Sequence, residues 1–370
     1  MNYKNWLFGI IAIIVFAIII GFSVSGSNDT IKVGLVAPLS GDTAIWGNNV
    51  LVGTQIAIDE FNAKGGLDGK KIELIVEDGK CSAEGGSKAY NTIVNGYDVI
   101  AMLGPVCSAE ASAGLPIGVT KNIPTVIATA SAPELTALGD NIFRVYPSDA
   151  LQGVFAADYV YNKLGKKKTA IIYVSNAWGQ GVADKFKTAY EKLGGSIVYY
   201  DKILQDEIEV KDIIANAKGK GAEALYLPIY PTAIMAVFKT VKELNWDISI
   251  LGGDATLSEE VIKNNLSENT LFTQPKFSIS EELKNKVKEK EGEDFMINVG
   301  ASYGYDATRV LLIALENADS LSSEDIITEL AKTKMVGVSN PLIEFDAEGD
   351  LKTGEFEVQI IKNNEAVPVK

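Results

Sequence analysis

The sequence predicts two similar α/β lobes, each built on a parallel sheet with helices on both faces. Three observations lead to this prediction. The chain has 370 residues, which is too long for one ordinary domain and comfortable for two. Short apolar runs alternate with helical patterns, as expected of βαβ units. The alternation pauses at Arg144–Pro147 and then begins again, so the second series forms a sheet of its own.

The first series opens with a short apolar strand and a loop rich in glycine and serine. In the helix that follows, Val50, Ala57 and Phe61 fall on one face. Lys64-Gly65-Gly66 ends this helix with a lysine in the last turn and glycine beyond it. The strands expected in this half are Ile31–Ala37, Ile72–Glu77, Val99–Leu103 and Thr125–Ala128, with further helices near Ala83–Val94 and at Ala109–Val119.

The second series repeats the design. Its expected strands are Ala170–Val174, Ser196–Tyr200, Ala224–Pro228 and Ile248–Leu251, and its expected helices are Ala150–Leu164, Gly181–Leu193, Val210–Ala217 and Thr232–Leu244. The stretch from Ile279 to Leu330 is expected to be mostly helical, with late strands at Phe345 and Phe356–Ile361. Because the two halves look alike, we expect a cleft between them, and open α/β sheets bind ligands in such clefts.

The N-terminal segment predicts export. No residue from Leu7 to Val24 is charged, and a run of this length reaches the lower limit for crossing a bilayer. Lys4 precedes the run and no acid does, so the chain after Ser25 is expected outside the cytoplasm. Ser23-Val24-Ser25 resembles a cleavage site, which leaves both a retained anchor and a removed signal peptide open.

The chain contains two cysteines, Cys81 and Cys107, and export favours a disulfide between them. The bridge would close a loop of about 27 residues and contribute about 3.5 kcal/mol in the chain-entropy model. Two unrelated buried thiols are the alternative.

Composition excludes several classes of function. The formal net charge is −14, so a nucleic-acid partner is not expected. The chain has no histidine, which removes Ser-His-Asp and Cys-His catalysis and histidine zinc sites. Gly179-Gln180-Gly181 precedes a helix, but Asp184 stands where a dinucleotide loop needs its third glycine. The acidic run Asp346–Asp350 indicates a plain turn rather than a calcium loop. We therefore expect neither a cofactor nor a metal.

Candidate ligand-binding residues follow the predicted strands. Ser40-Gly41, Trp46-Gly47, Gly104–Ser108 and Thr129–Pro133 follow strands of the first half, and Trp178, Tyr230 and Asp254 follow strands of the second. Each has a simple structural explanation, since serine caps helices, tryptophan fills cores and aspartate favours turns. Together they place hydroxyls and backbone amides on one lobe, and aromatic rings and one acid on the other.

With these segments the sequence resembles the branched-chain amino acid type of substrate-binding protein of ABC transporters, over nearly all of residues 31–370. The resemblance rests on the order and spacing of several motifs rather than on one of them. They are Ile31–Gly34, Pro38–Gly41, Trp46-Gly47, Ile58–Gly66, Glu77-Asp78 before Cys81, Gly104–Ser108, Ser131–Thr136 and Tyr305–Ala307, together with the two-cysteine loop.

The resemblance implies a type I periplasmic binding protein fold: two doubly wound parallel-sheet lobes joined by three crossovers, which close like a jaw. The first lobe would comprise 30–148 plus 277–354 and the second 149–276 plus 355–370, after an N-terminal segment 1–29. It also implies an amino acid ligand, ABC permease subunits as partners and a monomeric protein.

The resemblance further implies roles for individual residues. Ser108 and Ser131 would hydrogen-bond the ligand's α-carboxylate, and the carbonyl of Thr129 would accept from its ammonium. Asp254 takes the position of the acid that pairs with the ammonium, although it is one methylene shorter than the glutamate common there. Both charges of a zwitterion leaving water need partners, because an unpaired buried charge is costly.

Bulky side chains are implied around the rest of the ligand. Trp46 and Trp178 would cover it, with Tyr230 beside them. Relatives that bind leucine-like ligands can carry aromatic residues at the positions of Ile229 and Gly300. Ile229 keeps this wall apolar, whereas Gly300 removes bulk and would enlarge the pocket, so the preferred ligand side chain stays open.

The sequence therefore predicts an extracytoplasmic amino-acid-binding component of an importer, not an enzyme. Short amides or urea are the alternative ligands, since related proteins bind them. A ligand-sensing receptor ectodomain shares the fold and is the second class. An enzyme acting on a small carboxylate is the third, although no nucleophile motif or metal cluster supports it.

Overall fold

The computed structural model describes residues 30–369. The segment expected to be a signal peptide or anchor, residues 7–24, lies outside the described residues. Across 30–369, no helix is both long and apolar enough to cross a membrane.

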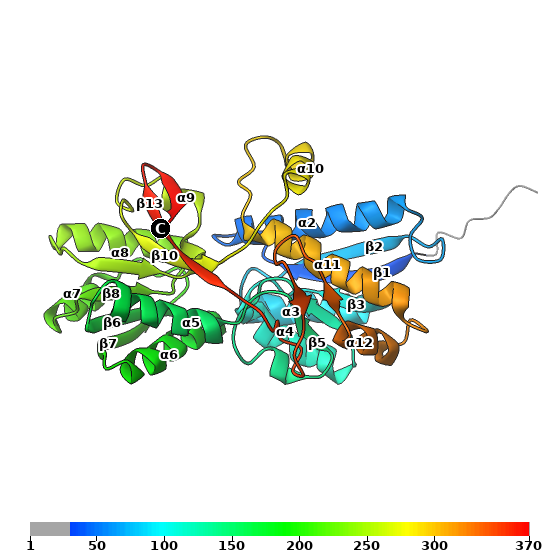
Figure 1. Cartoon of the computed structure of the whole chain (residues 1–370), viewed down its shortest axis with the longest axis horizontal. Helices are drawn as coiled ribbons and strands as arrows, with labels where there is room; N and C mark the ends of the chain where they lie inside the picture. The colour runs from blue at the N-terminus through cyan, green and yellow to red at the C-terminus, as the bar shows by residue number, and fades with distance from the viewer. Residues whose placement is uncertain (1–29, 370) are drawn as a thin grey trace, which may run out of the picture.

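The described chain forms two α/β lobes that lie side by side (Figure 1). The first contains a five-stranded sheet in the order β2-β1-β3-β4-β5, in which every pair is parallel. Its strands are β1 (Ile31–Ala37), β2 (Ile72–Asp78), β3 (Val99–Leu103), β4 (Thr125–Ile127) and β5 (Ile142–Arg144). Its helices are α2 (Ala44–Ala63), α3 (Ala83–Gly96), α4 (Ser108–Thr120), the short η1 (Thr136–Leu138), α10 (Glu281–Glu291), α11 (Val299–Asn317) and α12 (Ser323–Ala331). The small ribbon β11 (Lys334–Met335) and β12 (Ile343–Glu344) completes it.

The second lobe contains a seven-stranded sheet in the order β14-β13-β10-β9-β8-β6-β7. Its strands are β6 (Lys168–Val174), β7 (Ser196–Ile203), β8 (Ala224–Leu227), β9 (Ser249–Gly252), β10 (Leu271–Pro275), β13 (Phe356–Lys362) and β14 (Glu365–Pro368). Its helices are α5 (Asp149–Asp158), the π-helical η2 (Tyr159–Lys163), α6 (Ala177–Lys192), α7 (Lys211–Gly219), α8 (Pro231–Glu243), η3 (Asp254–Thr256) and α9 (Glu259–Ile262).

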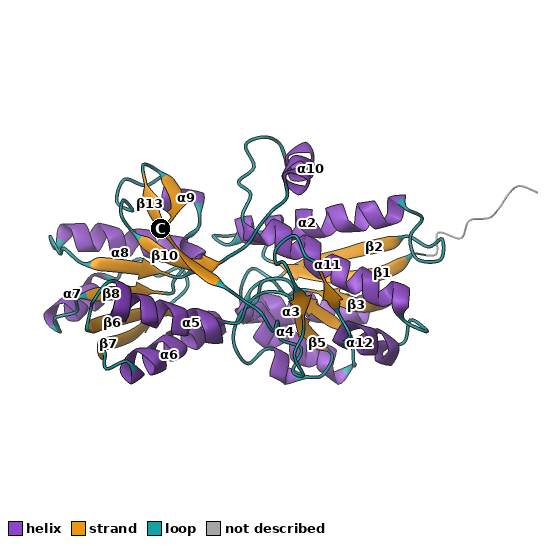
Figure 2. Ribbon diagram, viewed as in Figure 1, coloured by secondary structure: helices purple, strands orange, loops and turns teal. Residues whose placement is uncertain are grey.

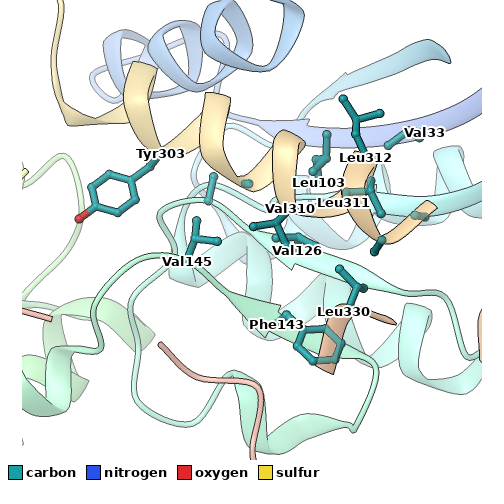
Figure 3. Close-up of a cluster of buried hydrophobic side chains, with 14 of the residues drawn as sticks. Val33, Leu103, Val126, Phe143, Val145, Tyr303, Val310, Leu311, Leu312 and Leu330 are labelled. Atoms are coloured by element: carbon teal, nitrogen blue, oxygen red, sulfur yellow. The ribbon is translucent and has the colours of Figure 1, made fainter. Parts of the chain in front are cut away.

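Both faces of the first sheet are covered, which explains why its strands are continuous apolar runs. On one face, alternate residues of β1 pack with α2, α11 and α12 in one core cluster. Figure 3 shows part of this cluster, in which Leu103 and Val126 lie near Val310 of α11. On the other face, Val36 and Met102 pack against α3 and α4. A Cβ at Gly53 of α2 would lie 2.0 Å from the carbonyl oxygen of Ala301 in α11, so glycine lets these helices approach closely.

The two sheets share one winding pattern, as the sequence predicted. In the first lobe the order is β2-β1-β3-β4-β5, and the corresponding strands of the second run β7-β6-β8-β9-β10. The chain therefore reverses direction across each sheet between β1 and β3 and between β6 and β8. Ligands of doubly wound folds bind outside the carboxyl ends of the strands at such switch points.

Three connections join the lobes (Figure 2). They follow β5, follow β10, and precede β13. The backbone amide of Lys276, in the second connection, donates to the carbonyl of Glu355 in the third at 2.7 Å. We propose that the lobes divide within these connections, at the boundaries 148/149, 276/277 and 354/355 expected from the sequence.

The structure differs from the expectation in the second sheet, which is not entirely parallel. β13 runs antiparallel to β10, and β14 runs antiparallel to β13. The third connection returns from the first lobe and enters the open edge beside β10 in the opposite direction. The short strands β5, β10 and β14 were not expected, and the helix expected at Ala150–Leu164 ends its α-helical part at Asp158.

Candidate functional site

A cavity lies between the lobes, beside the carboxyl ends of strands from both sheets. Its volume is about 50 Å³, so the lobes lie close together at this point. It is lined by Asp42, Thr43, Trp46, Val106, Cys107, Ser108, Thr129 and Ser131 from the first lobe and by Trp178, Tyr230, Pro231, Asp254 and Ala255 from the second. Seven of the eight residues predicted to bind ligand, all except Ile229, are thus brought together.

On the first lobe, Ser108 ties two loops to each other. It is the first residue of α4, and its Oγ accepts from the backbone amides of Ser131 and Ala132, each at 3.1 Å. Thr129 donates its hydroxyl to the carbonyl of Val106 at 2.9 Å. Because both bonds to Ser108 use its oxygen as acceptor, its hydroxyl hydrogen remains able to donate toward the cavity.

Ser131 is bonded twice to the first residue of α5. Its Oγ donates to a carboxylate oxygen of Asp149 at 2.9 Å, and the backbone amide of Asp149 donates to the Ser131 carbonyl at 2.9 Å. With its hydrogen given to Asp149, the hydroxyl of Ser131 can only accept from a ligand. This geometry suits an ammonium rather than the carboxylate role that the resemblance implies.

On the second lobe, Asp254 follows β9 and opens η3. Its Oδ1 accepts from the amide of Ala255 at 3.1 Å, and its Oδ2 accepts from the hydroxyl of Tyr146 at 2.8 Å. Tyr146 belongs to the first connection, and its ring packs against Tyr303 with centroids 4.7 Å apart. Asp254 is therefore fixed to the hinge as well as to its own loop.

Two buried carboxyl groups, Asp149 and Asp254, are costly to ionise at this site without a cation. Burial raises the pKa of both Asp149 and Asp254, and the charge of Asp254 raises that of Asp149 further. The nearby guanidinium of Arg144 is buried and already bonded to Asp350 at 2.7 and 2.9 Å and to the carbonyl of Ala132 at 2.7 Å. A cationic ligand group would supply the charge that these two acids lack.

Aromatic rings form the wall of the second lobe. Trp178, in the first turn of α6, stacks on Tyr230, with ring centroids 5.1 Å apart and planes at 24°. The hydroxyl of Tyr230 accepts from Asn176 Nδ2 at 3.3 Å and lies 3.3 Å from the sulfur of Cys81. Trp46, near the start of α2, is half-buried and faces the same cavity from the first lobe.

The disulfide between Cys81 and Cys107 is confirmed. It joins the loops that follow β2 and β3, and Cys107 lines the cavity directly before Ser108.

Two residues singled out from the sequence lie elsewhere. Ile229 is fully buried in the core of the second lobe and does not line the cavity. At Gly300 there is no added space, because a Cβ there would meet Asn298 Oδ1 at 2.9 Å and the Trp46 carbonyl oxygen at 3.2 Å. The glycine serves close packing of α11 against α2 and does not enlarge the pocket.

Sequence reasoning missed several residues of the site. Asp42 and Thr43 lie within the loop between the expected Ser40-Gly41 and Trp46, and Pro231 and Ala255 directly follow predicted site residues. Asp149 gave no signal, because an acid after Ser148 at the start of a helix is the usual sign of a cap.

Comparisons with known proteins agree with this geometry. The sequence profile of a family described as periplasmic binding protein matches residues 30–362. The chain is 27% identical to the Leu/Ile/Val-binding protein homolog 3 of Brucella melitensis, over 97% of each chain. It is 27% identical to the leucine-, isoleucine-, valine-, threonine-, and alanine-binding protein of Pseudomonas aeruginosa, over 95% of this chain and 94% of that one.

Solved structures are similar over the same length. A leucine binding protein, LivK, from Thermotoga maritima superposes with a TM-score of 0.84 at 25% identity, covering 92% of this chain and 98% of that one. The branched-chain amino acid transporter substrate binding protein LivJ from Streptococcus pneumoniae, in complex with isoleucine, gives 0.80 at 26% identity, covering 92% and 100%. The two-lobed fold, the cleft at its switch points and the match over residues 30–362 together show that this chain belongs to the periplasmic binding protein family.

Proposed function

We propose that this protein is the extracytoplasmic solute-binding component of an ABC importer and that it captures an apolar α-amino acid, with branched-chain side chains favoured. The observation that carries this proposal is a small cavity lined by the buried acid Asp254 from one lobe and by the free hydroxyl donor of Ser108 from the other. A zwitterion needs partners of both kinds, because leaving either charge unmatched in a buried site is costly.

The ligand's carboxylate would dock on the first lobe. Ser108 offers its hydroxyl hydrogen there, and as the first residue of α4 it lies where free amides and the helix dipole favour an anion. The ammonium would lie between the carboxylate of Asp254, the hydroxyl oxygen of Ser131 and the carbonyl of Thr129. All three groups accept, so together they suit a group with three hydrogens to donate.

The apolar rings explain the preference for an apolar side chain. Trp46 enters from the first lobe, and the stacked pair Trp178 and Tyr230 enters from the second. Closing the lobes would remove these rings from water around an aliphatic group. An uncharged amide or urea would leave Asp254 without a cation, which favours an amino acid over these alternatives. The relatives named for leucine, isoleucine and valine support the same class.

Delivery would follow closure. The ligand would first bind the carboxylate site of one lobe, the other lobe would then bring Asp254 to the ammonium, and the closed protein would meet the permease subunits. We propose that residues 7–24 export the chain or anchor it to the outer face of the membrane, and that the protein acts as a monomer.

A thermal-shift screen of the full chain tests the ligand class. L-leucine, L-isoleucine, L-valine, acetamide and urea are each added in excess. A ligand at 100 times its Kd adds about 2.7 kcal/mol of stability, which moves the melting temperature by a few degrees. Shifts with the three amino acids and none with the two amides are expected. A shift with acetamide or urea alone would overturn the proposed ligand class and leave the family unchanged.

A further inference from the structure

A buried carboxylate behind the cavity has no part in the site described so far. Glu110 lies on the first turn of α4, two residues after Ser108, and its side chain is inaccessible to solvent. One of its oxygens accepts from the amide of Cys81 at 2.8 Å, and the other accepts from the amide of Cys107 at 3.0 Å. A single carboxylate thus holds the backbone at both ends of the disulfide.

The turn that Glu110 holds is conformationally strained. Lys80 and Cys81 both have positive φ, at 54° and 51°, a backbone region that residues other than glycine rarely adopt. Asp78 accepts from the amide of Lys80 at 2.9 Å, and Glu110 accepts from the next amide along the chain. The neighbouring Gly79 makes room, since a Cβ there would lie 2.4 Å from the Glu110 carboxylate.

This turn presents a sulfur atom to the opposite lobe. Cys81 Sγ lies 3.3 Å from the hydroxyl of Tyr230. Because Asn176 already donates to that hydroxyl oxygen, the hydrogen of Tyr230 is free to point to the sulfur. Tyr230 is also the ring on which Trp178 stacks in the cavity wall. The contact therefore joins the two lobes directly beside the proposed ligand.

We propose that Glu110 is a positioning residue of the cleft: by binding the amides of both cysteines, its carboxylate sets the place of the disulfide against Tyr230 and so favours the closed arrangement of the lobes. The inference rests on the proposed function only where it speaks of ligand affinity. Glu110 itself does not touch the cavity.

Protonation of the Glu110 carboxylate would weaken its hold on the two ends of the disulfide. A hydrogen on one carboxyl oxygen makes that oxygen a poorer acceptor, so the hydrogen bond from one of the two cysteine amides weakens. Burial, together with the charge of Asp78, raises the pKa of Glu110 to about 7, although the hydrogen bonds from the two cysteine amides act in the opposite direction. The titratable groups near Glu110 are Asp78 and Lys80 on the strained turn and Tyr230 on the other lobe. Helix α3 faces Glu110 with Gly86, which has no side chain to titrate. The contact is therefore expected to weaken in mildly acidic medium.

The test compares the full-length protein with Glu110→Gln, which keeps the side chain's shape and cannot ionise. Glu84→Gln is the matched control, because Glu84 is an exposed acid on the first turn of the adjacent helix α3. The Kd of L-leucine is measured at pH 5.5 and pH 8.0 for all three proteins. Asp149 and Asp254 also respond to pH, but they do so in every protein and cancel in the comparison.

The ratio of Kd at pH 5.5 to Kd at pH 8.0 is expected to be about three- to tenfold larger in the unaltered protein and in Glu84→Gln than in Glu110→Gln, since about one hydrogen bond is at stake. Equal ratios in all three would overturn the proposal.

A second measurement needs no ligand. Intrinsic fluorescence, to which Trp178 contributes through its stack on Tyr230, should titrate with a midpoint near pH 7 in the unaltered protein and lose that transition in Glu110→Gln. The same transition in both proteins would also overturn the proposal. If L-leucine does not bind the unaltered protein, the proposed ligand fails, and the fluorescence titration still decides the role of Glu110.

Discussion

The two lobes have the same strand order but prepare their sides of the cleft differently. On the first lobe the loops after β2, β3 and β4 are linked to one another by a disulfide, by Glu110 and by Ser108. On the second lobe, Asp254 is tied to Tyr146 in the hinge, and Tyr230 contacts the first lobe's disulfide. Apart from the bonds between Ser131 and Asp149, the site loops of the first lobe are held by contacts within that lobe. The contacts of the second lobe's site residues instead reach to the first connection and to the first lobe.

This difference teaches that one winding pattern can supply two kinds of surface. The first lobe offers fixed donors and acceptors, which suit the initial capture of a ligand. The second offers a charge and rings whose placement depends on closure. Substitutions on the first lobe should therefore alter the shape of the docking site, and those on the second should alter how firmly the closed form holds its ligand.

The largest effect is expected at the single acid of the second lobe's cavity wall. Asp254→Asn leaves the ligand's ammonium without its charged partner, which costs about 3–5 kcal/mol, or more than about a hundredfold in Kd for L-leucine. Asp42→Asn is the matched control, because Asp42 also lines the cavity but is exposed. Calorimetric titration measures both. Unchanged binding by Asp254→Asn would show that the ammonium is matched elsewhere.

Removing the disulfide tests how much it contributes to the stability of the first lobe. Replacing both Cys81 and Cys107 with serine removes a cross-link between residues 26 apart. The free energy of unfolding is expected to fall by about 3.5 kcal/mol in the chain-entropy model. Denaturant unfolding of the two proteins measures the loss. If stability is retained, the hydrogen bonds of Glu110 and Ser108 hold the loops without the bridge.

The pH dependence of stability distinguishes the empty cleft from the occupied one. Because the pKa of Asp149 and of Asp254 is raised on folding, their contribution to stability is complete below about pH 4 and is lost as pH rises through the raised values. A bound ammonium offsets this loss. The melting shift caused by L-leucine is therefore expected to be larger at pH 7.5 than at pH 4.5. A constant shift would argue against cation binding between these acids.

The smallest effects on L-leucine affinity are expected within the first lobe. There the hydroxyl of Ser108 can donate to the ligand, whereas that of Ser131 already donates to Asp149. Ser108→Ala removes an acceptor of two backbone amides as well as a donor to the ligand, whereas Ser131→Ala removes one acceptor for the ligand and the donor to Asp149. We expect a loss of about 1 kcal/mol in L-leucine affinity for Ser131→Ala and a larger loss for Ser108→Ala. The reverse order, measured by the same titration, would restore the carboxylate role first inferred for Ser131.

Much of the fold could be predicted because buried parallel strands have a plain signature. Ile31–Ala37 and Val99–Leu103 were expected at the bounds the structure shows, since each is an apolar run followed by proline or glycine. β5 escaped notice because it has three residues and ends in Arg144. The charge of that arginine is satisfied by Asp350, more than two hundred residues further along the chain, where local patterns carry no information.

The site was predictable where a residue follows a strand and unpredictable where its role depends on the other lobe. Ser108 and Asp254 follow strands and line the cavity. Ile229 also follows a strand, but its side chain enters the core, and an apolar residue at such a position fits either surface equally well. Asp149 acts through Ser131 of the opposite lobe, a contact that only the folded chain creates.

The contacts of Arg144, which directly precedes the first connection between the lobes, matter for protein engineering. Its guanidinium binds the carbonyl of Ala132 in a loop beside the ligand cavity and, through a two-pronged contact, Asp350 ahead of the third connection. Lysine carries the same charge but lacks the planar fork that serves these partners together. A biosensor built on this scaffold could have its opening tuned at residues of the three connections, whereas exchanging Arg144, which directly precedes the first of them, would change the sensor's motion and its recognition of the analyte at once.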